Sequence, residues 1–461
     1  MALRRGLQIL QSSIPEAAKH GRRSLSLMSL RPGDFAKHMK ENNLRRCYVV
    51  FDKEAGQPVS SSAHIDDLQQ FCLNDSNDYL NHEGFFLELG RRTDTLMGAF
   101  VWRTHRGQAC GGIRLWEYNT MEEYLRDGLR LAYGMGAKSA LAGLWAGGGK
   151  GVIASPGARA NEVEFRKDLF LDYGDFLSGL NGCYVAAEDA GVVVSDLDHV
   201  HQRTRYTTCI SEEIGGSGNP SIATGKGVVC AMEAALDFLE MGTLEGKTVV
   251  SQGCGNVARI IFDALLEKGI GKIIATDCNE KALALTQKTL HSKSKGRLFL
   301  EHVAVGELGT LSKECDILSP NALGNILTKD TIPNIKAKVV CGAANNQLGK
   351  PEDNLLMSQM GITYIVDFLC NRMGIVNCAN ETYGRLDSDP AILQHFDKNW
   401  EDSIWNVTHR VLSVAKEKGI TPVMAAAEVA EAKSLQLHPI WPHRSQKIIE
   451  DLVNQKWEEK Q

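Results

Sequence analysis

Residues 248–258 of this 461-residue chain, TVVSQGCGNVA, decide its fold. The first five residues predict a buried strand, and the glycines after them predict a tight turn that leads into a helix. Gly253 permits the turn, Gly255 lets the backbone approach a pyrophosphate, and Ala258 lets the helix pack closely against the strand. The N-terminus of such a helix stabilises phosphate charge, so the stretch predicts a dinucleotide site.

The chain around this stretch alternates between strand and helix patterns. Apolar runs at residues 272–276, 315–318 and 338–341 predict further strands. Such alternation implies a parallel, doubly wound sheet. Asp277 closes the strand that follows the glycine turn, where a carboxylate accepts hydrogen bonds from an adenosine ribose and repels a 2′-phosphate. NAD is therefore the predicted cofactor, rather than NADP.

The composition excludes several classes of protein. The chain has 51 Lys and Arg against 56 Asp and Glu, and this mild acidity argues against nucleic-acid binding. It has no uncharged run of about 20 apolar residues, so no membrane span is predicted. Its 12 cysteines have no metal-binding spacing, so the sequence predicts no metal site and cysteines that pack as small apolar side chains.

The basic residues are concentrated at the start of the chain. Residues 1–31 carry six Arg and Lys against the single acid Glu16, and apolar and serine residues are interleaved with them. This pattern is typical of a mitochondrial transit peptide, which we assign to residues 1–38, with the mitochondrial matrix as the expected location. The alternatives are a disordered basic tail and a cytoplasmic protein.

A second glycine-rich stretch, Gly147-Gly148-Gly149-Lys150, lies twelve residues after another lysine, Lys138. Three consecutive glycines indicate close approach of the backbone to something else. The stretch is not a phosphate-binding loop of the G-x-x-x-x-G-K-[ST] type, because Gly151 follows Lys150. One interpretation is a surface loop with a solvated lysine. The other is a lysine in a cleft near a second ammonium, where burial and like charge lower its pKa and make it a general base.

Ten collinear stretches between residues 111 and 384 resemble the glutamate/leucine/phenylalanine/valine dehydrogenase family, and most of all its leucine-specific members. They are residues 111–116 (GGIRLW), 134–138 (GMGAK), 142–144 (AGL), 147–150 (GGGK), 187–191 (AEDAG), 217–220 (SGNP), 253–258 (GCGNVA), 322–324 (ALG), 344–347 (ANNQ) and 380–384 (NETYG).

The resemblance implies an α/β fold of two domains. Residues 40–215 would form a substrate-binding and oligomerisation domain, and residues 216–404 a Rossmann-type, doubly wound NAD-binding domain. The C-terminal helices, residues 405–461, would return to the first domain. Relatives are homo-oligomers, so the same is expected here.

The resemblance also implies a reaction and residue roles. A member of the family removes the amino group of an L-amino acid, passes a hydride to NAD and releases a 2-oxo acid with ammonium. Lys150 would activate the water, Asp189 would exchange a proton with the amine, and Lys138 would bind the substrate carboxylate. The remaining roles are substrate contacts by Gly111, Gly112 and Asn346, a nicotinamide contact by Thr224, and cofactor contacts by Gly253, Gly255, Asn256, Val257, Asp277, Ala322 and Asn346.

The resemblance places four further residues around the substrate side chain: Cys110, Ala187, Ile375 and Cys378. Glutamate-specific members have Lys where this chain has the neutral Cys110. The four positions imply an apolar pocket suited to leucine, valine or isoleucine. Arg372 and Met373 replace Ala and Gly of many members, and we expect them to add bulk and charge near this pocket.

Three alternatives stay open at this point. The first is a catalytically silent NAD-binding regulatory protein on the same scaffold. The second is a member of the family that acts on phenylalanine or another amino acid. The third is an NAD oxidoreductase of hydroxy acids. The third is disfavoured because such enzymes commonly use a histidine base, and the stretches around Lys150 and Asp189 contain none.

Overall fold

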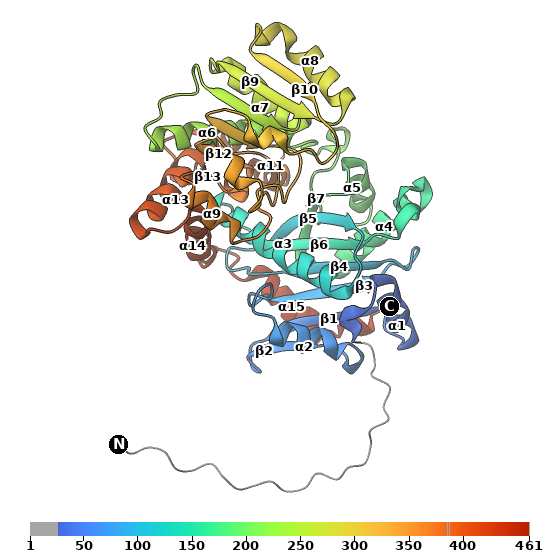
Figure 1. The fold of residues 1–461 in the computed structure, drawn as a ribbon. Helices are drawn as coiled ribbons and strands as arrows, with labels where there is room; N and C mark the ends of the chain where they lie inside the picture. The colour runs from blue at the N-terminus through green and yellow to red at the C-terminus, as the bar shows by residue number, and fades with distance from the viewer. Residues whose placement is uncertain (1–25, 385, 387, 461) are drawn as a thin grey trace, which may run out of the picture.

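The computed structural model describes residues 26–384, 386 and 388–460. Two domains, each built on one sheet, lie one above the other (Figure 1). The chain passes from the first to the second between β7 (Tyr184–Glu188) and β8 (Thr248–Gln252), and its C-terminal part runs back toward the first. The predicted fold class, two α/β domains, is confirmed.

The first domain contains a mixed sheet of seven strands in the order β2-β1-β3-β4-β6-β5-β7. Strands β5, β6 and β7 run parallel to one another, and the remaining neighbours pair antiparallel. The strands are β1 (Arg46–Asp52), β2 (Gln57–Ser60), β3 (Gly84–Leu89), β4 (Leu96–Val101), β5 (Ala109–Trp116), β6 (Gly147–Ala154) and β7 (Tyr184–Glu188).

Helices cover both faces of this sheet, and alternate strand residues point to opposite faces. Phe85 and Leu87 of β3 pack with α1, α2 and α3, whereas Phe86 between them packs with α4 and α5. The helices are α1 (Pro32–Glu41), α2 (Asp66–Asn74), α3 (Met121–Leu141), α4 (Val163–Gly179) and α5 (Val194–His201). The Thr120 side chain caps α3 by accepting a hydrogen bond from the Glu123 amide, as its spacing predicts.

The folded domain begins earlier than the sequence predicts. Residues 1–25 of the predicted transit peptide lie outside the described residues, but residues 32–38 form most of α1. Phe35 and Met39 of this helix are fully buried in the core of the first domain. The helix was not predicted because the basic residues of the segment outweighed the apolar face of α1 in the composition.

The second domain is the predicted Rossmann-type domain. Its six strands are all parallel, in the order β10-β9-β8-β11-β12-β13. They are β8 (Thr248–Gln252), β9 (Lys272–Asp277), β10 (Leu298–His302), β11 (Ile317–Pro320), β12 (Val339–Val340) and β13 (Thr363–Tyr364). The helices that position the site are α6 (Ser221–Phe238), α7 (Asn256–Glu267), α10 (Asp367–Cys370) and α11 (Met373–Glu381).

The C-terminal helices return to the first domain only in part. Helix α13 (Ile404–Lys418) packs against α6 of the second domain, and α14 (Pro422–Ser434) packs against α13 and α3. Only α15 (Arg444–Asn454) and the turn after it join the first core, where the Trp457 ring packs edge-on against Phe86 at 5.2 Å between centroids. The prediction that residues 405–461 return to the first domain is therefore wrong for α13, because the apolar face of α13 packs against α6.

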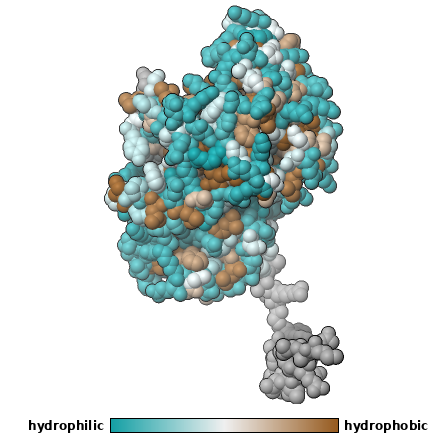
Figure 2. All heavy atoms as spheres, turned by 90° about the vertical axis from the view of Figure 1, so that its left-hand side faces the viewer, coloured by the Kyte–Doolittle hydropathy of each residue, from teal (hydrophilic) through white to brown (hydrophobic). Residues whose placement is uncertain are grey.

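The surface is mostly polar. Figure 2 shows hydrophilic residues over most of one side of the molecule, with apolar residues in small groups between them. Within the described part of the chain, no helix combines the length and the apolarity that a membrane crossing requires.

A buried histidine makes the stability of the second domain depend on pH. Burial, assisted by the charge of Arg372, lowers the pKa of His395 from 6.5 to about 3. His395 therefore stays neutral in the folded protein at pH values below about 6.5, where the same histidine in the unfolded chain takes up a proton. This stabilising contribution is complete above that pH and is lost as the pH falls toward 3.

The unfolding free energy should fall when the pH is lowered from about 7 to about 5. We expect this fall to be about 2 kcal/mol smaller in His395→Gln than in the unsubstituted protein. Urea unfolding at the two pH values measures the difference, and His64→Gln, at an exposed position, is the control. Equal losses in the His395 variant and the unsubstituted protein would contradict the prediction.

Candidate active site

A cleft of about 540 Å³ lies between the two domains. The first domain contributes predicted catalytic and substrate-binding residues, and the second contributes the N-terminal ends of α6 and α7. The structure thus gathers most of the predicted site at one place. The predicted residues that line the cleft are Gly112, Lys138, Lys150, Ala187, Asp189, Thr224, Gly255, Asn256, Val257, Ile375 and Cys378.

The stretch that ends in Lys150 is the start of strand β6 and not a surface loop. Its glycines serve close packing: a Cβ on Gly148 would lie 2.3 Å from the Ala132 carbonyl oxygen, in α3. Strands β5 and β6 pair as far as Gly148 and pair again from Gly151 onward. Lys150 lies in this interval, with a side chain only 3% exposed, and it lines the cleft, so it is not a solvated lysine on a surface loop.

Asp189 forms an ion pair with Lys150. The Lys150 Nζ donates to Asp189 Oδ2 at 2.7 Å, and Arg114 Nε donates to the same oxygen at 3.2 Å. Burial raises the pKa of Asp189, but Lys150 and Arg114 outweigh burial and lower this pKa to about 2. Asp189 is therefore ionised at neutral pH. Arg114 was not identified from the sequence as a site residue, although it belongs to one of the stretches that carry the family resemblance.

Lys138 lies near the end of α3, facing the same cleft. Burial lowers the pKa of Lys138, the Asp367 carboxylate opposes this effect, and the Lys150 charge adds to it. The two lysines are thus close enough to influence each other, as their pattern predicts. Asp367 was not identified from the sequence, because no spacing connects it to Lys138.

The glycine turn has the conformation that a dinucleotide requires. Gly253 has φ +106°, which favours glycine, and Gly255 caps the N-terminus of α7 with open space beside its Cα. Asp277 ends β9, and its Oδ2 accepts a hydrogen bond from the Cys254 amide at 2.8 Å. Ala322 packs against the turn: a Cβ added to Gly253 would lie 2.7 Å from the Cβ of Ala322. The turn therefore leaves the N-terminal amides of α7 accessible to a phosphate.

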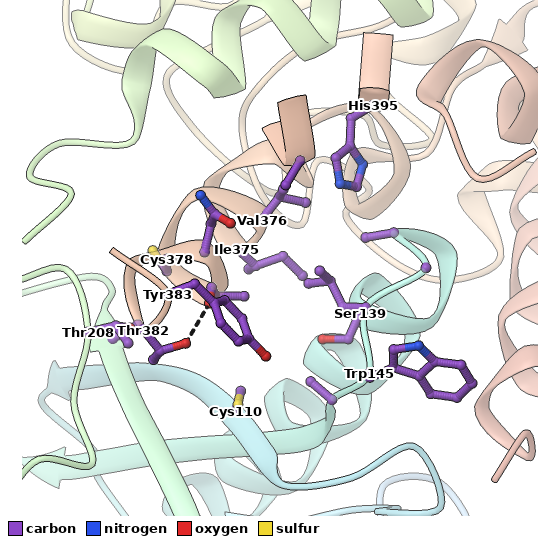
Figure 3. Close-up of a pocket in the computed structure, with 18 of the residues that line it drawn as sticks. Cys110, Ser139, Trp145, Thr208, Ile375, Val376, Cys378, Thr382, Tyr383 and His395 are labelled. Atoms are coloured by element: carbon purple, nitrogen blue, oxygen red, sulfur yellow. Dashed lines mark hydrogen bonds between the residues drawn. The ribbon is translucent and has the colours of Figure 1, made fainter. Parts of the chain in front are cut away.

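A second pocket, of about 590 Å³, continues from the cleft. The two share Met135, Ala187, Ile375 and Cys378. Figure 3 shows Cys110 on one side, Ile375 and Val376 of α11 on the other, and Tyr383 between them. Of the described residues that line this pocket, none is Lys or Arg. Met135 was not identified from the sequence, although it lies in the 134–138 stretch.

Two cysteines of the site are not free thiols. Cys378 of α11 is joined by a disulfide to Cys209, with 5.6 Å between their Cα atoms. Both residues line the cleft, so Cys378 presents a disulfide sulfur there. The prediction that every cysteine packs as a separate small side chain is wrong for this pair, because the fold joins segments 169 residues apart.

Six predicted residues do not line the cleft: Cys110 and Gly111 line the second pocket, and Gly253, Asp277, Ala322 and Asn346 line neither. Asn345 is among the residues that line the cleft, and its neighbour Asn346 is not. Asn346 has φ +51°, and its amide donates to Asp367 Oδ2 at 2.6 Å. Asn345 accepts a hydrogen bond from Asn371 at 2.8 Å. The turn at Asn346 therefore makes Asn345 the better candidate for a substrate contact.

Arg372 and Met373 do not enter the pocket, contrary to expectation. Both side chains are fully buried. The Arg372 guanidinium donates to the carbonyl oxygens of Leu141, at the end of α3, and Asp402. Burial lowers the pKa of Arg372 to about 9. The added charge thus connects α11 to α3 and to the residues before α13, and it stays away from the substrate.

We expect Arg372→Ala to lower the unfolding free energy by about 3 kcal/mol, because it leaves two buried carbonyls unpaired and opens a cavity. Arg372→Met retains the volume without burying a charge, so its loss is expected to be smaller. Chemical denaturation measures both. The ratio of activities on leucine and valine is expected to stay unchanged, and a changed ratio in the Met variant would restore a role in specificity.

Most of the chain is similar to known amino-acid dehydrogenases. The family described as Glutamate/Leucine/Phenylalanine/Valine dehydrogenase matches residues 215–438, and the Glu/Leu/Phe/Val dehydrogenase dimerisation domain matches residues 96–206. A leucine dehydrogenase of Geobacillus stearothermophilus is 41% identical over 332 residues, 72% of this chain and 84% of its own. A valine dehydrogenase of Streptomyces coelicolor is 36% identical over 340 residues, 73% of this chain and 87% of its own.

A solved structure extends the comparison. The crystal structure of L-tryptophan dehydrogenase from Nostoc punctiforme superposes with a TM-score of 0.63 at 28% identity, covering 77% of this chain and 96% of that one. The two matched regions span most of the chain and include both sides of the cleft. The chain therefore belongs to the glutamate/leucine/phenylalanine/valine dehydrogenase family.

Proposed function

We propose that this protein catalyses the reversible, NAD-dependent oxidative deamination of branched-chain L-amino acids. The amino acid, NAD⁺ and water give the 2-oxo acid, ammonium, NADH and a proton. The observation that carries the proposal is the buried ion pair of Lys150 and Asp189, which faces the N-terminus of α7 across the cleft.

The charges of the cleft suit an amino acid. Lys138 binds the substrate carboxylate, for which a half-buried ammonium that lines the cleft is a strong partner. Asp189, held ionised, stabilises the positive charge of the imine and exchanges a proton with the amine. Lys150 activates the water that attacks the imine carbon and stabilises the oxygen that becomes the keto group. The burial of Lys150 keeps these steps away from bulk water.

The second domain suits NAD. Gly255 and the amides of Asn256 and Val257 would hold the pyrophosphate, and Asp277 would hold the adenosine ribose. Thr224, at the start of α6, would hold the nicotinamide amide. When bound, the nicotinamide accepts the hydride that leaves the substrate Cα.

The pocket beside the cleft selects an apolar side chain. It contains no described Lys or Arg to pair with the side-chain carboxylate of glutamate. An apolar pocket distinguishes substrates that differ by one methylene by only about 1–3 kcal/mol. Leucine, valine and isoleucine are therefore all substrates, in agreement with the leucine and valine dehydrogenases among the relatives.

The test is a screen of NADH and ammonium formation by the purified protein over the common L-amino acids, repeated with NADP. The expected result is activity on leucine, valine and isoleucine with NAD. Preference for phenylalanine or tryptophan would change the substrate class. NAD binding without turnover on any amino acid would favour the catalytically silent regulatory protein.

We also propose that the protein is a homo-oligomer and acts in the mitochondrial matrix. The match to a dimerisation domain supports the first, and the basic, acid-poor start of the chain supports the second. Light scattering of the purified protein tests assembly, where a monomer at micromolar concentration would contradict it. Fusion of residues 1–31 to a fluorescent protein tests the mitochondrial location. Diffuse cytoplasmic fluorescence would contradict that location.

A further inference from the structure

Three metal-ligating side chains meet outside the cleft, in the first domain. Glu83 directly precedes β3, His105 lies in the turn between β4 and β5, and His443 precedes α15. One potential ligand atom of each lies within 4.8 Å of those of the other two. None of the three lines the cleft or the apolar pocket, so the proposed catalysis does not use them.

The Glu83 carboxylate is buried and has only neutral donors. It is 7% exposed, and it accepts hydrogen bonds from the amide and the hydroxyl of Thr104 at 2.7 and 2.6 Å. The nearby cations have other partners: Lys53 pairs with Glu450 at 2.7 Å and Arg103 pairs with Glu431 at 2.6 Å. Burying a carboxylate costs free energy unless a cation compensates it.

The two imidazoles are also incompletely satisfied. The rings of His105 and His443 meet edge to face, with 4.3 Å between centroids. The Nδ1 atoms of both rings are shielded from solvent and have no hydrogen-bond partner among the described residues. Leaving a buried polar nitrogen unpaired costs about 1–3 kcal/mol. One positive ion bound between the three side chains would compensate all these deficits together.

We propose that Glu83, His105 and His443 form a binding site for one divalent metal ion of the zinc type. Two imidazole nitrogens and a carboxylate oxygen are a donor set that Zn²⁺ accepts, with water as the fourth ligand. Tetrahedral Zn²⁺ with bonds of about 2.0–2.2 Å holds its ligand atoms about 3.4 Å apart, so the side chains close by roughly 1 Å on binding. Each carboxylate oxygen retains a free lone pair beside its bond to Thr104.

The ion would fasten the C-terminal part of the chain to the first domain. Helix α15 lies along this domain (Figure 1), and its Ile448, Ile449 and Leu452 already enter the core. His443 sits immediately before this helix, and the other two ligands lie in segments that connect strands of the first domain. The site is therefore structural, since it connects segments far apart in sequence at a distance from the chemistry.

The test uses the untagged full chain, first stripped of metal by a chelator and then titrated with Zn²⁺. We expect about one ion per chain, and a tetrahedral absorption spectrum when Co²⁺ replaces Zn²⁺. His105→Gln and His443→Gln are each expected to weaken binding more than about a hundredfold, because loss of an outer partner alone costs 10–100-fold. His64→Gln, at an exposed position, is the control.

Stability and exchange give a second measurement that does not need the variants. Zn²⁺ should raise the melting temperature of the stripped protein and slow amide hydrogen exchange in residues 444–454, while NADH formation stays unchanged. No Zn²⁺ binding at micromolar concentration by the folded, unsubstituted protein would overturn the proposal. Binding that survives in both histidine variants would overturn it as well.

Discussion

Lys150→Met is expected to lower kcat by at least about a thousandfold, or about 4 kcal/mol of activation free energy. The side chain is buried beside Asp189, and methionine supplies no group that can activate the water for the attack on the imine. Methionine fills a similar volume, and Arg114 still pairs with Asp189 at 3.2 Å, so the fold and the charge of the carboxylate should persist.

Steady-state rates on leucine measure the loss, and fluorescence titration with NADH measures cofactor binding, which should change by less than about threefold. Lys167→Met, at an exposed position of α4, is the matched control and should retain full activity. Near-normal turnover in the Lys150 variant would remove this lysine from the mechanism. Loss of NADH binding would instead indicate that the substitution disturbs the cleft as a whole.

Gly111→Ala is expected to destabilise the first domain by more than about 4 kcal/mol. A Cβ at this position would lie 1.8 Å from the Gly149 carbonyl oxygen, and this contact is between backbones of adjacent strands. Strands β5 and β6 must then separate where they hold Lys150. Such a separation would also disturb the hydrogen bonds from the Tyr184 hydroxyl to the carbonyl oxygens of Gly111 and Gly112, at 2.5 and 3.2 Å.

Thermal and urea unfolding measure this effect. Gly134→Ala is the matched control, since its Cβ would meet nothing within 4 Å on helix α3, and alanine there should stabilise by about 1 kcal/mol. If Gly111→Ala yields too little folded protein, soluble yield against the control is the readout. A Gly111 variant as stable and active as the unsubstituted protein would mean that the strands adapt freely.

The second domain was the more predictable part of the fold. Strand β8 has the predicted bounds, and Gly253 has the predicted turn conformation, because a glycine turn between a strand and a helix is a local pattern. Helix α7 begins at Asn256, inside the stretch of the predicted turn, since the last turn residues themselves adopt helical geometry.

The site was predictable where it depends on motifs, and not where it depends on packing between distant segments. Lys150 and Asp189, which the resemblance assigns to one reaction, form an ion pair although 39 residues separate them. The Cys209–Cys378 disulfide, the burial of Arg372 and the position of Asp367 beside Lys138 depend on how α11 and α10 pack against the first domain. No spacing in the sequence encodes these contacts.

The return of α15 has a consequence for how the protein is made. Arg46 of β1 donates to the carbonyl oxygen of Lys460, which the ribosome adds 414 residues later. At about 5–20 residues per second, that interval is roughly 20–80 s. During this time the apolar groove for Ile449, Leu452 and Trp457 is open while the second domain can already fold. Chaperones that bind exposed apolar surface should therefore hold the first domain until translation of its last helix is complete.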